Sequence, residues 1–304
     1  MTPPTRMRLL RPSLAVALSL VPALTLAPTT ALAFCRTTTC GSQPDPTQCP
    51  ACGSAIAWES ACIGLRVDAR VLPDTLTAAA FHGHVADAAR AWSSFLCPGT
   101  IRPPSFAMTV LEDLAFPVGY FEGAPNVNTI TFRNHWGDDV FHAPDAAAIT
   151  IVTFTSPSAH IRDADTELNL RSAANPRGFV FATDGRTNAA DLDTIVTHEL
   201  GHTQGLAHSS ERSAVMWYSA GRGELRRVPT DDDRAGLCAI YPTRIPEACT
   251  PDTGRLTFGG DGLSCTTSHG NRTSPECLLL ALAAVARVAQ SGRARRVTRT
   301  TRAG

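Results

Sequence analysis

The chain has 304 residues, of which 43% are hydrophobic, with 22 Gly and 22 Pro. This composition fits a globular protein with many turns and excludes wholesale disorder. All 27 acidic residues lie between positions 34 and 277, whereas three Arg lie in residues 1–33 and six in residues 278–304. An acidic body argues against a nucleic-acid-binding core, because phosphate contacts require clustered cations.

Residues 1–33 have the layout of a secretory signal peptide. Three Arg precede an apolar stretch at residues 14–27, and small residues follow at Ala31 and Ala33. We therefore expect cleavage after Ala33 and a secreted or cell-surface protein. Cys35 raises the alternative of a lipoprotein, but the bulky Phe34 before it disfavours lipidation.

All ten cysteines follow this segment, and an even number in an oxidising compartment predicts disulfide bonds. We expect residues 34–61 to form a Cys-rich extension held together by disulfides, whose pairing the sequence leaves open. The run Cys49-Pro-Ala-Cys52 is also compatible with half of a zinc knuckle, although no second pair follows at knuckle spacing.

The body of the chain alternates strand-like and helix-like patterns. An amphipathic helix is expected over residues 77–96, ending before Pro98-Gly99, a second helix after an N-cap at Asp191, and a third from Thr230 to about Ile240. The pair Thr230 and Asp233 has capping-box spacing. Strand-like runs lie at residues 65–72, 106–111, 127–133, 148–154 and 179–182. This order predicts one compact α/β domain of about 180 residues.

The second helix carries the chemistry, in the run His198-Glu-Leu-Gly-His202-Thr-Gln-Gly205-Leu-Ala-His208. His198 and His202 are four residues apart, so they lie on one helical face and both reach one Zn²⁺. Glu199 points a carboxylate at the metal-bound water without binding the metal, as a general base does. Gly205 allows the backbone to leave the helix, which returns His208 as a third ligand and leaves a fourth position open for water.

This string resembles the metzincin zinc endopeptidases. Ser209 after the third histidine, and the run 225–241, resemble the matrixin branch, and residues 161–169 are similar to a strand of bacterial matrixin-like proteins. The resemblance covers about residues 62–243. It implies an α/β (α+β) metzincin-like zincin domain, with a twisted, mostly parallel five-stranded sheet, three helices and zinc in the cleft.

The resemblance also implies roles for the residues after the third histidine. Ser213-Ala-Val-Met216-Trp-Tyr218 resembles the metzincin Met-turn, in which Met216 forms an apolar floor beneath the zinc ligands. Tyr218 has the Met-x-Tyr spacing of the astacin and serralysin branches, whose Tyr stabilises the transition state; the alternative is a structural Tyr. The implied activity is that of a secreted zinc endopeptidase of the EC 3.4.24 type, which acts on a protein or peptide bound along the edge strand.

The sequence departs from the matrixin pattern in two further respects. The zinc-blocking pro-segment is missing, and Cys40 stands only seven residues after the expected cleavage site, so a disulfide is the favoured interpretation of this cysteine over a latency role. The sequence offers only weak candidate ligands for a second, structural Zn²⁺ or for a Ca²⁺. Such residues are ordinarily interpreted as exposed or solvated polar side chains. These candidates are His135, Asp138, Asp139 and His142 for zinc, and Asp163, Asp165 and Glu167, on what we take as an edge strand, for calcium.

Residues 244–304 form a Cys-containing tail. Cys277, a short apolar run and an Arg cluster resemble, in degenerate form, the C-terminal sorting tails of myxobacterial surface proteins, which implies attachment to the cell envelope. The alternative is a disordered basic tail. The main alternative for the whole protein is a catalytically silent surface or adhesion module that keeps the metzincin fold, although the ligands and Glu199 are intact. We expect a monomer that binds no nucleic acid.

Overall fold

The computed structural model describes residues 33–242, apart from short gaps at 41–42, 44, 61, 112–116, 123–125 and 137–141, together with the backbone of residues 298–303. The expected signal peptide and most of the tail, including Cys277 and the apolar run that follows it, lie outside the described residues. The expected cleavage, the sorting tail and the domain boundaries therefore stay predictions.

One sheet forms the base of the fold, with its strands in the order β4, β3, β5, β7, β6, β11. Their bounds are β3 Cys62–Asp68, β4 Ala107–Val110, β5 Asn128–Arg133, β6 Ala148–Phe154, β7 His160–Asn169 and β11 Thr298–Ala303. The four neighbouring strands β4, β3, β5 and β7 run parallel. Strand β6 is antiparallel to β7, and β11 is antiparallel to β6. The short β2, Ala57–Trp58, pairs with the start of β7. The mostly parallel sheet of five strands, β3 to β7, is thus confirmed, with β2 and β11 added to it.

The expected strand at residues 179–182 forms in its last two residues only, as β8 (Phe181–Ala182). It pairs with β9 (Ala190–Asp191) in a small separate sheet and does not join the main sheet. The fifth strand of the main sheet is β7, at the residues whose resemblance to a matrixin strand predicted one. From Asp163 to Asn169 both faces of β7 are buried, as in a strand at the centre of a sheet.

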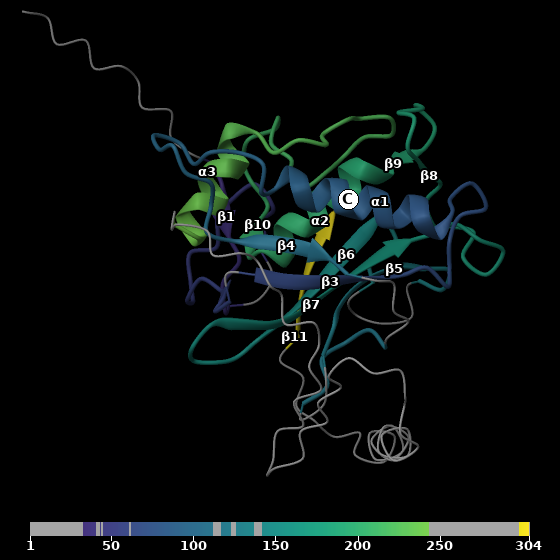
Figure 1. The fold of residues 1–304 in the computed structure, drawn as a ribbon. Coiled ribbons are helices and arrows are strands. Elements are labelled where there is room, and N and C mark those ends of the chain that lie inside the picture. The colour runs from purple at the N-terminus through teal and green to yellow at the C-terminus, as the bar shows by residue number, and fades with distance from the viewer. Residues whose placement is uncertain are drawn as a thin grey trace, which may run out of the picture. The chain divides into compact units, whose positions relative to one another are not determined.

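The three expected helices form, but the first ends at Ala91, short of the expected end at residue 96. Thr77 caps α1 (Ala78–Ala91), Asp191 caps α2 (Leu192–Thr203), and Thr230 with Asp233 forms the capping box of α3 (Asp231–Ile240). Helices α1 and α2 pack against each other over the sheet (Figure 1). None of the helices in the described part of the chain combines the length and apolar character that a membrane span requires.

The Cys-rich extension packs on the domain as an integral part of it. Its strand β1 (Cys35–Arg36) pairs with β10 (Leu206–Ala207), which lies between the second and third histidines of the motif. Disulfides join Cys35 to Cys49, Cys40 to Cys52 and Cys97 to Cys238, and Cys62 is also disulfide-bonded. These bonds confirm the expected disulfides and exclude both the zinc half-knuckle at Cys49 and Cys52 and a free, zinc-blocking Cys40.

The acidic residues of β7 lie in the interior of the sheet. We expected Asp163, Asp165 and Glu167 to be solvated on an edge strand, but β7 lies between β5 and β6, and all three side chains are 1% exposed. Asp165 accepts hydrogen bonds from the backbone N–H groups of Thr129 and Gly119. The interpretation as solvated surface acids is therefore wrong, because strand order and not composition decides their exposure.

Candidate metal centre

Helix α2 presents the first two histidines from within the core. Leu192, Ile195, Val196 and Leu200 are at most 2% exposed and anchor the helix on the sheet and on α1. His198 and His202, one turn apart on this helix, are themselves only 4% and 0% exposed. The indole Nε1 of Trp92, the C-cap residue of α1, donates to the carbonyl oxygen of Thr197 at 2.8 Å, which fixes the depth of α2 beside the first histidine.

The hydrogen bonds of the two rings define where their protons lie. Nδ1 of His198 lies 2.7 Å from the carbonyl oxygen of Val215, and Nδ1 of His202 lies 2.9 Å from that of Leu206. A carbonyl oxygen only accepts, so each Nδ1 carries the proton and each Nε2 carries a lone pair. The two Nε2 atoms are 3.0 Å apart. Two lone pairs at that distance repel unless a cation lies between them, so the pair fits a metal ion.

The third histidine reaches the same point through a turn. Gly205 has a φ of +93°, and a Cβ at this position would lie 2.8 Å from the carbonyl oxygen of Ile56, so glycine is required both by conformation and by space. The chain then continues through β10 to His208, which is 7% exposed. One ligand atom from each of His198, His202 and His208 lies within 4.8 Å of the others. Neutral imidazoles are the donors that Zn²⁺ prefers, at about 2.0–2.1 Å, so the group fits this ion.

Burial keeps the first ligand in the protonation state that binding requires. Desolvation lowers the pKa of His198 to about 4, against the opposing effect of its bond to Val215. The ring is therefore neutral at pH 7, as a metal ligand must be.

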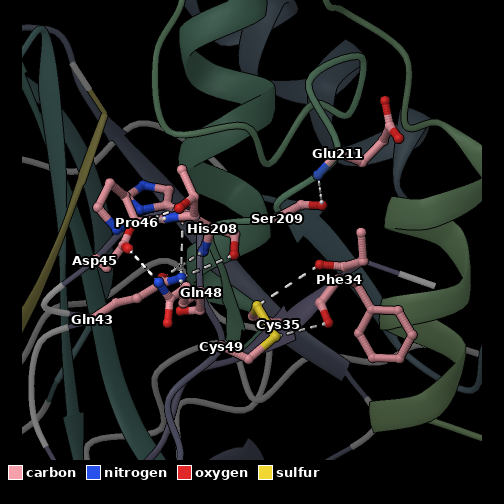
Figure 2. The surroundings of a disulfide bond; sticks show 12 residues. Phe34, Cys35, Gln43, Asp45, Pro46, Gln48, Cys49, His208, Ser209 and Glu211 are labelled. Atoms are coloured by element: carbon pink, nitrogen blue, oxygen red, sulfur yellow. Dashed lines mark hydrogen bonds between the residues drawn. A yellow bond between two sulfur atoms is a disulfide. The ribbon is translucent and has the colours of Figure 1, made fainter. Parts of the chain in front are cut away.

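The Cys-rich extension holds the backbone at His208. The side-chain oxygen of Gln43 accepts from the backbone N–H of His208 at 3.1 Å, and its Nε2 donates to the carbonyl oxygen of His208 at 3.3 Å (Figure 2). The same Nε2 also donates to the carbonyl oxygens of Pro46 and Gln48, inside the loop that the Cys35–Cys49 disulfide closes. Gln43 therefore connects the stapled extension to the third ligand. The sequence contains no signal for this contact, which joins residues 165 positions apart.

Glu199 is buried next to the first ligand. Its side chain is 0% exposed, its Oε2 accepts from the hydroxyl of Thr150 on β6 at 2.6 Å, and its Oε1 has no hydrogen-bond partner among the described residues. Desolvation raises the pKa of Glu199 to about 8, against the lowering effect of the Thr150 bond. A cation held by the histidines would favour the carboxylate form again. Thr150 was not anticipated, because a Thr in a strand carries no catalytic signal of its own.

Met216 lies beneath the helix that carries the ligands. It is 1% exposed, and a Cβ on Gly201 would lie 2.2 Å from its Sδ, so the close approach of α2 depends on that glycine. The carboxylate of Asp233 accepts from the backbone N–H groups of Val215 and Met216 at 2.9 and 3.0 Å. The capping residue of α3 thus also fixes the turn that carries both the methionine and the carbonyl oxygen that orients His198. The capping-box spacing predicted the contact between Asp233 and Thr230, but it carried no signal for the bonds to Val215 and Met216.

Tyr218 stands farther from the ligands. Its ring is half-buried, packs on Trp217 with centroids 4.6 Å apart, and lies 6.4 Å from the ring of His208. Of the candidates for a second zinc, His135 is exposed, Asp138 and Asp139 lie outside the described residues, and His142 is buried with its Nε2 2.5 Å from Glu167. The ordinary interpretation of His142 as part of an exposed loop is wrong. Within the described ranges, the three histidines of the motif form the one group of three metal-ligating side chains that converges.

A buried three-histidine centre on a core helix, with a buried glutamate beside the first ligand, defines a zinc-metalloprotease type of domain. Comparison with known proteins gives the family. Residues 124–242 match the Matrixin family, peptidase M10. The match and the histidine triad together define a matrixin metalloprotease domain in this part of the chain.

Individual relatives match over short segments. Metalloendoproteinase 1-MMP of Arabidopsis thaliana is 48% identical over 54 residues, which are 17% of this chain and 15% of the plant protein. Matrilysin of Homo sapiens is 36% identical over 63 residues, 20% of this chain and 24% of the human protein. Matrilysin of Rattus norvegicus is 39% identical over 66 residues, 21% and 24% of the two chains. Because the matched segments span less than a quarter of these relatives, the activity of the whole protein is a matter for proposal.

Proposed function

We propose that this protein is a secreted zinc endopeptidase that hydrolyses peptide bonds, with Glu199 as the general base. The observation that carries the proposal is the convergence of three buried histidines, two of them with facing Nε2 lone pairs, beside a fully buried carboxylate. His198, His202 and His208 would hold the zinc. When bound, zinc supplies Lewis acidity and lowers the pKa of a coordinated water to about 7.

The chain's own residues supply the proton transfers. Thr150 donates to Oε2 of Glu199, which orients the carboxylate and leaves Oε1 as the oxygen that accepts the proton of the attacking water. The protonated Glu199 then donates to the nitrogen of the leaving amine. The fully buried carboxyl of Glu199 holds the proton between these two steps.

Tyr218 is proposed as a further donor to the oxyanion. Its half-buried ring lies 6.4 Å from the ring of His208, which places a phenol near the ligands. Tyr218→Phe distinguishes this role from a structural one. A role in the transition state requires a fall in kcat with unchanged zinc affinity, whereas a structural Tyr requires a fall in thermal stability.

The substrate is proposed to be a protein or peptide in extended conformation, paired with the edge of β6 by backbone hydrogen bonds. This strand carries Thr150, so a peptide paired with it lies beside Glu199.

The disulfides support secretion, because such bonds form and persist in oxidising compartments outside the cytosol. The backbone nitrogens of Ala33 and Phe34 lie 2.6 and 3.0 Å from Oδ1 of Asp232 on α3. Cleavage after Ala33 would place the new ammonium group of Phe34 at this carboxylate, which the hydroxyl of Ser209 already orients. Attachment to the cell envelope through the tail remains a proposal from sequence, as does a monomeric state.

The test is cleavage of casein by the full chain compared with Glu199→Gln, with zinc content measured on both. We expect one zinc in each protein and a fall in kcat of about 10²–10⁴-fold in the variant. Glu59→Gln, which changes an exposed glutamate, serves as the matched control and should leave turnover unchanged. Zinc in both proteins with cleavage by neither would support the silent surface module instead.

A further inference from the structure

The strand β11 occupies the free edge of the sheet beside the candidate site. Strand β6 pairs on one side with β7 and on the other with residues 298–303, in six consecutive antiparallel pairs from Thr298 opposite Thr153 to Ala303 opposite Ala148. In Figure 1 this strand, in yellow, runs along β6 toward α2. A segment that follows the domain by more than fifty residues thus completes the sheet on this side.

The position of β11 along β6 brings it to the reacting groups. Thr301 pairs with Thr150, and the hydroxyl of Thr150 donates to the carboxylate of Glu199. Helix α2 also contacts both β6 and β11. The middle of the segment therefore passes the general base and does not merely cap a distant part of the strand.

A strand edge offers one row of backbone N–H and C=O groups, and two strands cannot pair with the same row at once. A peptide that binds β6 by strand addition requires the groups that β11 uses. The sequence of the segment, Thr-Arg-Thr-Thr-Arg-Ala, suits this role, because it is rich in β-branched residues and contains neither Pro nor Gly.

We infer that residues 298–303 are an internal occupant of the peptide-binding edge of β6 and compete with external peptides for it. The inference rests on the proposed function in one respect, namely that substrates bind β6. Because the segment is tethered, its effective concentration at the edge stays high without any tight intrinsic affinity. External peptides must displace it, so the segment raises KM and leaves kcat unchanged.

The test uses the full chain with substitutions in β11. Successive residues of a strand point their N–H groups to opposite sides, so Thr300→Pro/Thr301→Pro removes one donor toward β6 whichever residue faces it. Thr300→Val/Thr301→Val is the matched control, because it keeps both N–H groups and the β propensity. With a short fluorogenic peptide as substrate, we expect the proline variant to show a KM about tenfold lower at equal kcat, and the valine variant to match the parent.

A second arm adds the segment in trans. A synthetic peptide of residues 296–304 should inhibit the proline variant competitively, and the same peptide carrying both proline substitutions should not. Equal KM values in the parent and both variants, together with no inhibition by the peptide, would overturn the inference while leaving the protease activity standing.

If no form of the chain cleaves any substrate, the proposed function fails and the inference is decided by binding alone. The fluorescently labelled peptide 296–304 is then titrated with the zinc-loaded proline variant, and anisotropy is measured. Saturable binding that the unlabelled parent peptide displaces and the proline-substituted peptide does not displace would support occupation of the edge. The absence of saturable binding would overturn it.

Discussion

Two of the three metal ligands are held by a helix, and the third is held by contacts from distant parts of the chain. His198 and His202 owe their relative position to the pitch of α2 and their ring orientation to two backbone carbonyl groups. His208 depends on the Gly205 turn, on the pairing of β1 with β10, and on Gln43 from the Cys-rich extension. The difference teaches that local helix geometry can position two ligands of a metal site, whereas the third ligand requires contacts from distant parts of the fold.

The largest effect is expected from removal of a ligand on the helix. His202→Ala deletes one of the two facing Nε2 donors, and the affinity for zinc should fall about a hundredfold or more, as expected when one ligand of a site is lost. Zinc affinity is measured by competition with a chromophoric chelator. His135→Ala, which changes an exposed histidine, is the control. A parent-like zinc affinity of His202→Ala would contradict the role of α2 in holding two of the ligands.

Next comes the packing that holds the helix in place. Gly201→Ala places a methyl group against Met216 and Trp92, and we expect a loss of about 1–3 kcal/mol in the free energy of unfolding, measured by urea denaturation. Gly83→Ala on α1 is a matched control, since nothing lies within 4 Å of its added Cβ, and it should raise stability slightly. An equal gain for both variants would show that α2 has room to move and that Met216 is not a fixed floor.

A smaller effect tests the long-range half of the site. Gln43→Ala removes both hydrogen bonds to the backbone at His208, and zinc affinity should fall about tenfold, within the range for residues that orient ligands. Gln48→Ala, which loses a bond to Asp45 on the surface, is the control. Unchanged affinity in Gln43→Ala would mean that the turn alone positions the third ligand.

The smallest expected effect is on the pH dependence of stability, through the buried acidic residues of the main sheet. Burial, reinforced by the neighbouring Asp165, raises the pKa of Asp163 well above its ordinary value. The folded state then retains a proton that the unfolded chain releases, so stability falls as pH rises above about 4 and is greatest on the acid side. We expect the melting temperature to decrease by a few degrees from pH 5 to pH 8.

Asp163→Asn should flatten this dependence, and Asp74→Asn, which changes an exposed residue, should not. The measurement is thermal denaturation at several pH values with zinc content held constant. A melting temperature of Asp163→Asn that depends on pH as the parent's does would contradict the burial of a protonated acid at this position of β7.

The sequence predicted well those features that depend on residues close together in the chain. Helix caps at Asp191 and Thr230 were correct because capping is decided within four residues, and the histidine spacing predicted the ligand face of α2 for the same reason. The β7 acids were placed wrongly, because their burial depends on which strands flank them. Thr150 and Gln43 were missed, since neither has a neighbour in sequence that marks its contact with Glu199 or His208.

The most direct test of the central claim is X-ray absorption spectroscopy at the zinc K-edge of the full, zinc-loaded chain. The account predicts one zinc with three imidazole nitrogens and one oxygen at about 2.0–2.1 Å and no sulfur in the first coordination sphere. A spectrum with sulfur ligands, or a correctly folded chain that binds no zinc, would contradict the three-histidine centre and with it the proposed protease.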